Sequence, residues 1–224
     1  MLEELVARRL TGEPLAWITG GTDFCGLRVC VHPGVYVPRS HSEGLARLAA
    51  RRLRAGGLAI DLCTGSGAIA RVLADAHPSA RVLATDVDER AVACARINRV
   101  EALHGDLFAP LPAELEARAD VVVAVVPYVP TPDLALLQRD TLTFESAVGY
   151  DGGTDGLAVL RRTVAETPRW LRPGGTLLLE LGGGQGEGLR DDLARQGFAT
   201  ITTLTDENGD ERGLEAALNG RTSI

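Results

Sequence analysis

A glycine-rich turn between an apolar segment and a helix-forming segment limits this 224-residue chain to a small set of folds. The apolar segment covers residues 58–62, glycines follow at positions 65 and 67, and the helical pattern begins at residue 68. Glycines let a backbone bend sharply and approach a ligand closely, and the start of a helix presents unpaired N–H groups. The segment therefore predicts a strand, a ligand-binding loop and a helix in succession.

The rest of the chain alternates strand-like and helical segments. Beyond the 58–62 strand, strands are predicted at 81–86, near 100–104, at 120–126, 176–181 and 198–204 and near 212–218, and helices at 68–76, 89–98, 156–171 and 185–196. This alternation predicts a doubly wound α/β fold with helices on both faces of a mostly parallel sheet. The last two strands are joined by a turn at 206–210 without a helix, so one strand of the seven is expected to be antiparallel.

Residues 1–40 differ from this pattern and are predicted to form a separate unit. An amphipathic helix opens the chain, and alternating apolar residues follow at 27–31. The turn residues at 32–34 predict that 35–37 pairs back on this strand as a β-hairpin. Residues 1–40 are therefore expected to form a helix and hairpin lid, and residues 41–224 the ligand-binding domain.

Composition excludes several classes of protein. The net charge of −7 disfavours nucleic acid as a partner. The four cysteines form no C-x-x-C pair, which predicts reduced thiols and a cytoplasmic location, and the four histidines have no metal-ligand spacing. No signal peptide opens the chain, and the most apolar run, at 121–126, is too short to span a bilayer. We therefore expect no metal and no membrane partner.

Three acidic residues lie at the ends of three successive predicted strands. Asp61 suits a cationic ammonium group and would repel a pyrophosphate. Asp86 can accept from vicinal ribose hydroxyls, and Asp106 from an adenine amino group, with Leu107 or Phe108 against the ring. Each acid alone is equally typical of a loop cap or a surface charge, but together they predict S-adenosylmethionine as the cofactor. The predicted cofactor contacts are Asp61, Cys63, Thr64, Gly65, Gly67, Asp86, Val87, Asp106 and Leu107.

Further motifs extend along nearly the whole chain. They are Arg9 with Gly12-x-Pro14-Leu15-Ala16-Trp17-Ile18-x-Gly20; Phe24-x-Gly26-Leu27-x-Val29; Val37-Pro38-Arg39-x-x-Ser42-Glu43; Asp61-Leu62-x-Thr64-Gly65-Ser66-Gly67-Ala68-Ile69-Ala70; and Glu145, Ala147 and Asp151-Gly152-Gly153-x-Asp155-Gly156-Leu157. On these motifs the chain resembles the HemK/PrmC family of protein-glutamine N-methyltransferases. The resemblance implies the class I methyltransferase fold and methyl transfer to a glutamine side-chain amide of a protein.

The segment after the fourth strand departs from the family. The family has Asn-Pro-Pro-Tyr there, and its Asn accepts a hydrogen bond from the target amide. The aligned residues, and the predicted catalytic ones, are Val125, Val126, Pro127 and Tyr128. Val125 has no hydrogen-bonding side chain, so activity toward glutamine depends on the Tyr128 ring and on a backbone carbonyl near Val126. A strand that simply continues through Val126 is the alternative interpretation.

The front of the chain is the second departure. Only a short helix precedes Thr11, whereas the family carries a helical N-terminal domain that helps to hold its protein substrate. The residues predicted to cover the acceptor are Phe24, Tyr36, Pro38 and Arg39. His41 replaces a residue usual in the family, and it is either a base near the acceptor or a solvent-facing helix cap.

Four functions remain open from the sequence. The first is methylation of a glutamine amide in a protein, and the second is methylation of a small metabolite by the same fold. The third is cofactor binding without turnover. The fourth, a nicotinamide-dependent oxidoreductase, is disfavoured by Asp61 and by Ala70, which stands where the third glycine of G-x-G-x-x-G is required.

Overall fold

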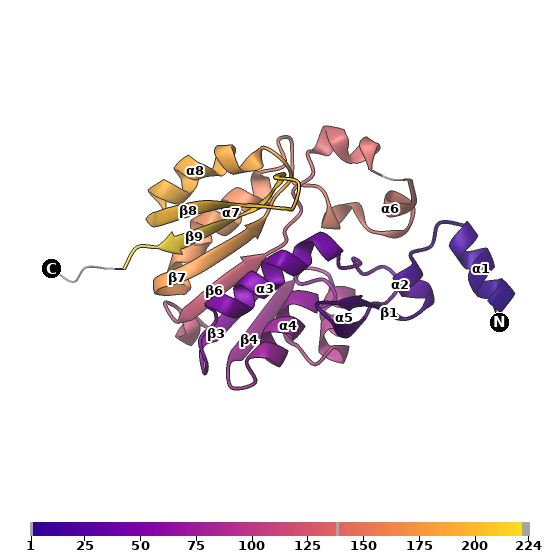
Figure 1. Cartoon of the computed structure of the whole chain (residues 1–224), viewed down its shortest axis with the longest axis horizontal. Coiled ribbons are helices and arrows are strands. Elements are labelled where there is room, and N and C mark those ends of the chain that lie inside the picture. Colours follow the sequence, from indigo (N-terminus) through magenta and orange to yellow (C-terminus); the bar gives the residue numbers. More distant parts are fainter. Residues whose placement is uncertain (1, 138, 221–224) are drawn as a thin grey trace.

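A central seven-stranded sheet organises the computed structural model, which describes residues 2–137 and 139–220. The strands are β3 (Leu58–Leu62), β4 (Arg81–Asp86), β5 (Glu101–His104), β6 (Ala119–Ala124), β7 (Leu171–Glu180), β8 (Phe198–Thr205) and β9 (Glu211–Leu218). Their order is β5-β4-β3-β6-β7-β9-β8, and β9 runs antiparallel to both of its neighbours. The predicted α/β class, with one antiparallel strand in a parallel sheet, is confirmed (Figure 1).

Helices cover both faces of this sheet (Figure 1). On one face lie α3 (Glu43–Arg52), α4 (Ala68–Ala76) and α5 (Glu89–Ile97), and on the other α7 (Ala158–Glu166) and α8 (Gln185–Arg195). Along β3 the side chains alternate between the two faces, since Ile60 packs with α7 and α8 while Ala59 packs with α3 and α4. Every residue of β3 is buried, as its continuous apolar run predicts.

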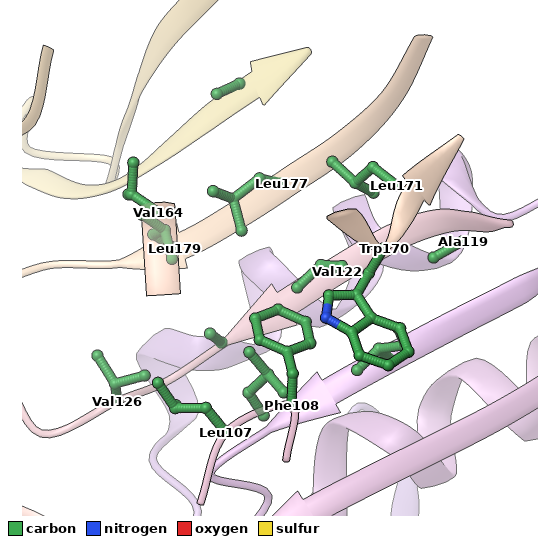
Figure 2. Close-up of a cluster of buried hydrophobic side chains, with 14 of the residues drawn as sticks. Leu107, Phe108, Ala119, Val122, Val126, Val164, Trp170, Leu171, Leu177 and Leu179 are labelled. Carbon is green, nitrogen blue, oxygen red and sulfur yellow. The ribbon is translucent and has the colours of Figure 1, made fainter. Parts of the chain in front are cut away.

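Aromatic stacking closes the core on the α7 side. The rings of Phe108 and Trp170 stack at 5.6 Å with 6° between their planes, and Figure 2 shows them beside Val122 and Leu177. Trp170 falls within the helix predicted at 156–171, and that prediction is too long. Helix α7 ends at Glu166, a short 3-10 helix follows, and β7 begins at Leu171. Pro168 cannot continue the helical hydrogen bonds, and burial draws the next residues into the sheet.

The N-terminal region contains a hairpin, but its pairing differs from the prediction. Its elements are α1 (Leu2–Leu10), α2 (Leu15–Ile18), β1 (Gly21–Phe24) and β2 (Leu27–Cys30). The partner of β2 is the preceding β1, not residues 35–37. Cys25 and Gly26 have φ of 52° and 81°, which gives the two-residue turn whose twist suits a hairpin. No residue of α1 is buried, and it projects from the body in Figure 1.

Residues 125–137 and 139–150 belong to an insertion that leaves the sheet between β6 and α7. Strand β6 ends at Ala124, so both the predicted strand end at residue 126 and the continuous-strand alternative are wrong. Pro127 has no N–H for a sheet ladder. The insertion holds two 3-10 helices, Thr131–Leu136 and Ala147–Gly149, and α6 (Arg139–Phe144), none of which the sequence pattern predicts. The loop after β6 is thereby available to a binding site.

We expect Leu160→Ala to destabilise the protein by about 2–5 kcal/mol, because this fully buried side chain of α7 fills the core against the sheet. Urea unfolding monitored by circular dichroism measures the loss. Leu136→Ala is the matched control, since Leu136 is 81% exposed and should change stability by no more than about 0.5 kcal/mol. Equal losses in the two variants would contradict this description of the core.

Candidate functional site

A cavity of about 560 Å³ lies at the carboxyl ends of β3, β4 and β6. Ligands of open α/β sheets bind at this edge. The predicted residues that line the cavity are Phe24, Tyr36, Pro38, Arg39, Asp61, Cys63, Thr64, Gly65, Asp86, Val87, Val125, Val126, Pro127 and Tyr128. The structure thus brings together the predicted lid, the predicted acceptor residues and most of the predicted cofactor contacts.

The two glycines of the loop after β3 serve different purposes. Gly65 has φ of 56°, and its N–H donates to Asp86 Oδ2 at 2.8 Å. Gly67 lies outside the cavity lining, has φ of 80°, and begins α4. A Cβ at Gly67 would lie 2.9 Å from Ala95 Cβ, so this glycine permits close packing of α4 against α5. Gly65 therefore shapes the cavity, and Gly67 holds the helix behind it.

Asp61 is a carboxyl group almost fully enclosed at the base of the cavity. It is 2% exposed, and its Oδ2 accepts from Thr64 Oγ1 at 2.6 Å and from Ala70 N at 3.1 Å. Burial raises the pKa of Asp61 to about 7, the two hydrogen bonds oppose this rise, and the nearby Asp86 carboxylate adds to it. A cation in the cavity would favour the ionised form.

Asp86 links the first loop to the second. Its carboxylate accepts from Gly65 N at 2.8 Å and from Asp88 N at 2.9 Å. Burial raises the pKa of Asp86, and hydrogen bonds from these backbone N–H groups counter that rise. Asp86 therefore fixes the glycine loop and also lines the cavity, and a carboxylate has capacity to accept further hydrogen bonds.

The third predicted acid occupies a different position. Asp106 and Leu107 lie outside the cavity lining, and Asp106 pairs with Arg162 of α7 at 2.5 Å. The Asp106 side chain is about half exposed, whereas Leu107 is buried. Cys63 does line the cavity, and burial raises the pKa of its thiol, which keeps the thiol protonated.

A buried glutamate joins the N-terminal segment to the insertion. Glu145 is 4% exposed and accepts from Val37 N at 3.0 Å, from Arg39 Nη2 at 2.7 Å and from the Tyr150 hydroxyl. Burial, followed by the hydrogen bond to Glu145, raises the pKa of Tyr150. The Arg39 guanidinium also lies 5.0 Å from the Tyr36 ring centre. In the sequence Glu145 is only one residue of a motif. The structure shows that it connects the N-terminal segment to the insertion.

A second buried glutamate lies behind the predicted acceptor residues. Glu180 ends β7, is 2% exposed, and its Oε1 accepts from the Tyr128 hydroxyl at 3.3 Å. The same oxygen lies 3.2 Å from His41 Nε2. Gln185 Nε2 donates to the Tyr128 carbonyl at 2.7 Å, so Tyr128 is held at both its ring and its backbone. The sequence analysis missed Glu180, although an acid at the end of an apolar strand beside β6 is a usable signal.

Neither a metal cluster nor a membrane-spanning helix is found within residues 2–137 and 139–220. No three His, Cys, Asp or Glu side chains in those ranges are placed to share a metal ion. None of the described helices combines the length and the apolar character needed to cross a bilayer. The cysteines are Cys25, Cys30, Cys63 and Cys94, and all are free thiols.

The sequence is similar to those of proteins named as methyltransferases. The family model described as "Methyltransferase small domain" matches residues 26–127. The release factor glutamine methyltransferase of Geobacter sulfurreducens is 40% identical over 214 residues, which is 93% of this chain and 74% of that enzyme. The enzyme of the same name from Neisseria gonorrhoeae is 39% identical over 94% of this chain and 78% of its own length.

Solved structures agree with these similarities. The release-factor-specific protein-(glutamine-N5) methyltransferase of Alicyclobacillus acidocaldarius is 26% identical, with a TM-score of 0.52 over 82% of this chain and 94% of that one. A methyltransferase of Pyrococcus furiosus gives a TM-score of 0.62 at 20% identity, over 95% of this chain and 97% of its own. The second comparison shows the fold alone.

We expect Asp61→Asn to change how stability depends on pH. Because the folded-state pKa of about 7 lies above the ordinary value, the folded protein retains a proton that the unfolded chain releases from about pH 4 upward. The contribution of Asp61 to stability is therefore complete below about pH 4 and is lost as the pH rises to about 7.

Denaturant unfolding at several pH values measures this effect. The stability of Asp61→Asn relative to the native protein should increase between about pH 4 and pH 7, by at most about 4 kcal/mol, and stay constant above. Asp75→Asn is the control, since Asp75 lies on the neighbouring α4 with a side chain 53% exposed. A difference independent of pH would mean that Asp61 is ionised throughout this range.

Proposed function

Because this chain belongs to the HemK/PrmC family of protein-glutamine N-methyltransferases, we propose that it transfers a methyl group from S-adenosylmethionine to a glutamine side-chain amide of a protein. The observation that carries this proposal is the 40% identity to a release factor glutamine methyltransferase over 93% of the chain. Its acceptor is thus a glutamine in a protein such as a release factor. Its free thiols and its net charge of −7 support a cytoplasmic location and an acceptor other than nucleic acid.

The charge of the cavity fits this cofactor. S-adenosylmethionine carries a sulfonium and an ammonium cation against one carboxylate. The cavity holds Asp61 and Asp86, and no basic side chain among the described residues pairs with either. In the proposal Asp61 attracts the ammonium group and Asp86 accepts from the ribose hydroxyls. The volume of about 560 Å³ lies in the range of small-molecule sites.

The adenine end is assigned to the loops after β4 and β5. Val87 lines the cavity beside Asp86, and Asp106 with Leu107 follows β5. For Asp106 to accept from the adenine amino group, its carboxylate must share its oxygens with Arg162. Cys63, Thr64, Gly65 and Gly67 complete the proposed cofactor contacts through the loop and the helix behind it.

The acceptor end is assigned to the segment that follows β6. When bound, the cofactor supplies an electrophilic methyl group, and the protein supplies position and a dry environment. Pro127 and the ring of Tyr128 would hold the glutamine side chain, with backbone carbonyls at Val125 and Val126 as hydrogen-bond acceptors. The buried Glu180 and Gln185 fix Tyr128 for this purpose.

Residues 1–40 act as the lid of domain 41–224 in this proposal. Phe24, Tyr36, Pro38 and Arg39 line one wall of the cavity. The Arg39–Glu145 pair at 2.7 Å attaches that wall to the insertion on the other side. Exclusion of water by this wall strengthens the electrostatic interactions inside.

We expect Asp86→Asn to weaken S-adenosylmethionine binding by roughly 10- to 100-fold, because hydrogen bonds to a charged group are lost. Isothermal titration calorimetry measures the change, and Asp75→Asn serves as the control. Asp106→Asn, measured alongside, reports whether the adenine reaches Asp106. Native protein that binds NAD but not S-adenosylmethionine would refute the cofactor assignment.

Methyl transfer to a glutamine-containing peptide tests the reaction itself. We expect slow transfer by the native chain and an increase on the order of 100-fold in Val125→Asn, which restores the positioning acceptor. Mass spectrometry of the peptide identifies the methylated residue, and thermal unfolding checks that the variant folds. Activity confined to Val125→Asn would mean that the native chain does not methylate glutamine.

A further inference from the structure

Glu180 and His41 form a pair at the acceptor end that the proposed cofactor site does not use. The Glu180 side chain is 3% exposed and that of His41 is 41% exposed, so the pair runs from the core to the cavity wall. His41 lines the cavity together with Tyr128. Burial of a carboxylate is costly unless donors satisfy it. The Tyr128 hydroxyl donates to Glu180 Oε1, and His41 Nε2 lies within hydrogen-bonding distance of the same oxygen.

The pair determines which nitrogen of His41 carries the proton. Where Glu180 Oε1 accepts at this 3.2 Å contact, Nε2 is the N–H donor of the neutral ring. Nδ1 then holds a lone pair. No partner for Nδ1 occurs among the side chains and backbone groups of the described residues. The imidazole is therefore prepared to accept a proton at Nδ1.

Methylation of an amide nitrogen produces a proton that must leave. The nitrogen lone pair forms the N–CH₃ bond, while the electrons of the broken S–CH₃ bond remain on sulfur as a neutral thioether. The nitrogen then carries one proton too many. The side chain of Val125 offers no basic group to take it, and a proton acceptor placed within reach contributes about 10²–10⁴-fold to such a transfer.

We propose that His41 is the proton acceptor of the reaction, taking the amide proton at Nδ1, and that Glu180 is its positioning residue. This inference rests on the proposed function, because that function identifies the methyl acceptor as a glutamine amide. As the N–H bond breaks, its electrons return to nitrogen and the proton forms an imidazolium at His41. Glu180 stabilises that cation across the 3.2 Å contact, and bulk water later takes the proton through the exposed edge of the ring.

Steady-state kinetics with S-adenosylmethionine and the glutamine peptide test the role of His41. We expect His41→Gln to lower kcat by on the order of 100-fold or more, with KM and cofactor affinity within about twofold of the native values. Glu180→Gln should lower kcat by a smaller factor. His77→Gln is the matched control and should keep the native kcat, since His77 lies outside the cavity lining, with Nε2 2.8 Å from the Ala50 carbonyl.

Nitrogen NMR of ¹⁵N-histidine-labelled protein gives a readout that needs no turnover. In native protein with a neutral ring, His41 should be the Nε2–H tautomer, and Glu180→Gln should give a mixture of tautomers. The His41→Gln spectrum assigns the signal. Native kcat in His41→Gln, loss of cofactor binding in that variant, or an Nδ1–H tautomer in native protein would overturn the proposal. Absence of any peptide methylation would refute the glutamine assignment. The tautomer of His41 would still show whether Glu180 accepts a hydrogen bond from Nε2.

Discussion

The parallel pairing of β3 with β4 and β6 is the constraint on which the rest of this structure depends. Leu62 lies opposite Thr85 on one side and opposite Ala124 on the other, so the three strands end at the same level. The loops that follow must therefore share one edge of the sheet. Since β3 is buried along its whole length, a shift in its register would disrupt both faces of the core.

Carboxylates with different partners divide the cavity into two ends. Asp61 and Asp86 are held by a hydroxyl and by backbone N–H groups, so their charge remains available to a cation. Glu145 is paired with Arg39, and this ion pair joins the N-terminal segment to the insertion. Glu180 faces a histidine and a tyrosine. In the proposed function the same side-chain chemistry thus serves cofactor attraction, anchoring and positioning, because each environment is different.

The proposed cofactor end of the cavity keeps the motif on which the family resemblance rests, while the proposed acceptor end departs from the family. The motif from Asp61 to Ala70 is intact, and its glycines have the positive φ values that the loop requires. Val125 stands where the family has a hydrogen-bonding side chain, and it lies in a loop that lines the cavity. His41, another departure from the family, faces Glu180 at the same end. Both departures therefore lie at the proposed acceptor end of the cavity.

Local features were readable from the sequence, and long-range ones were not. Apolar periodicity and glycine turns determined the strand and helix order and the loop at 61–67, because such patterns act over a few residues. Tertiary structure decided that β1 rather than 35–37 pairs with β2, and that β6 stops at Ala124. It also brought His41 to Glu180, 139 positions away. That contact depends on which strands become neighbours in the sheet. The order of the strands is determined by the burial of both sheet faces and not by any local sequence pattern.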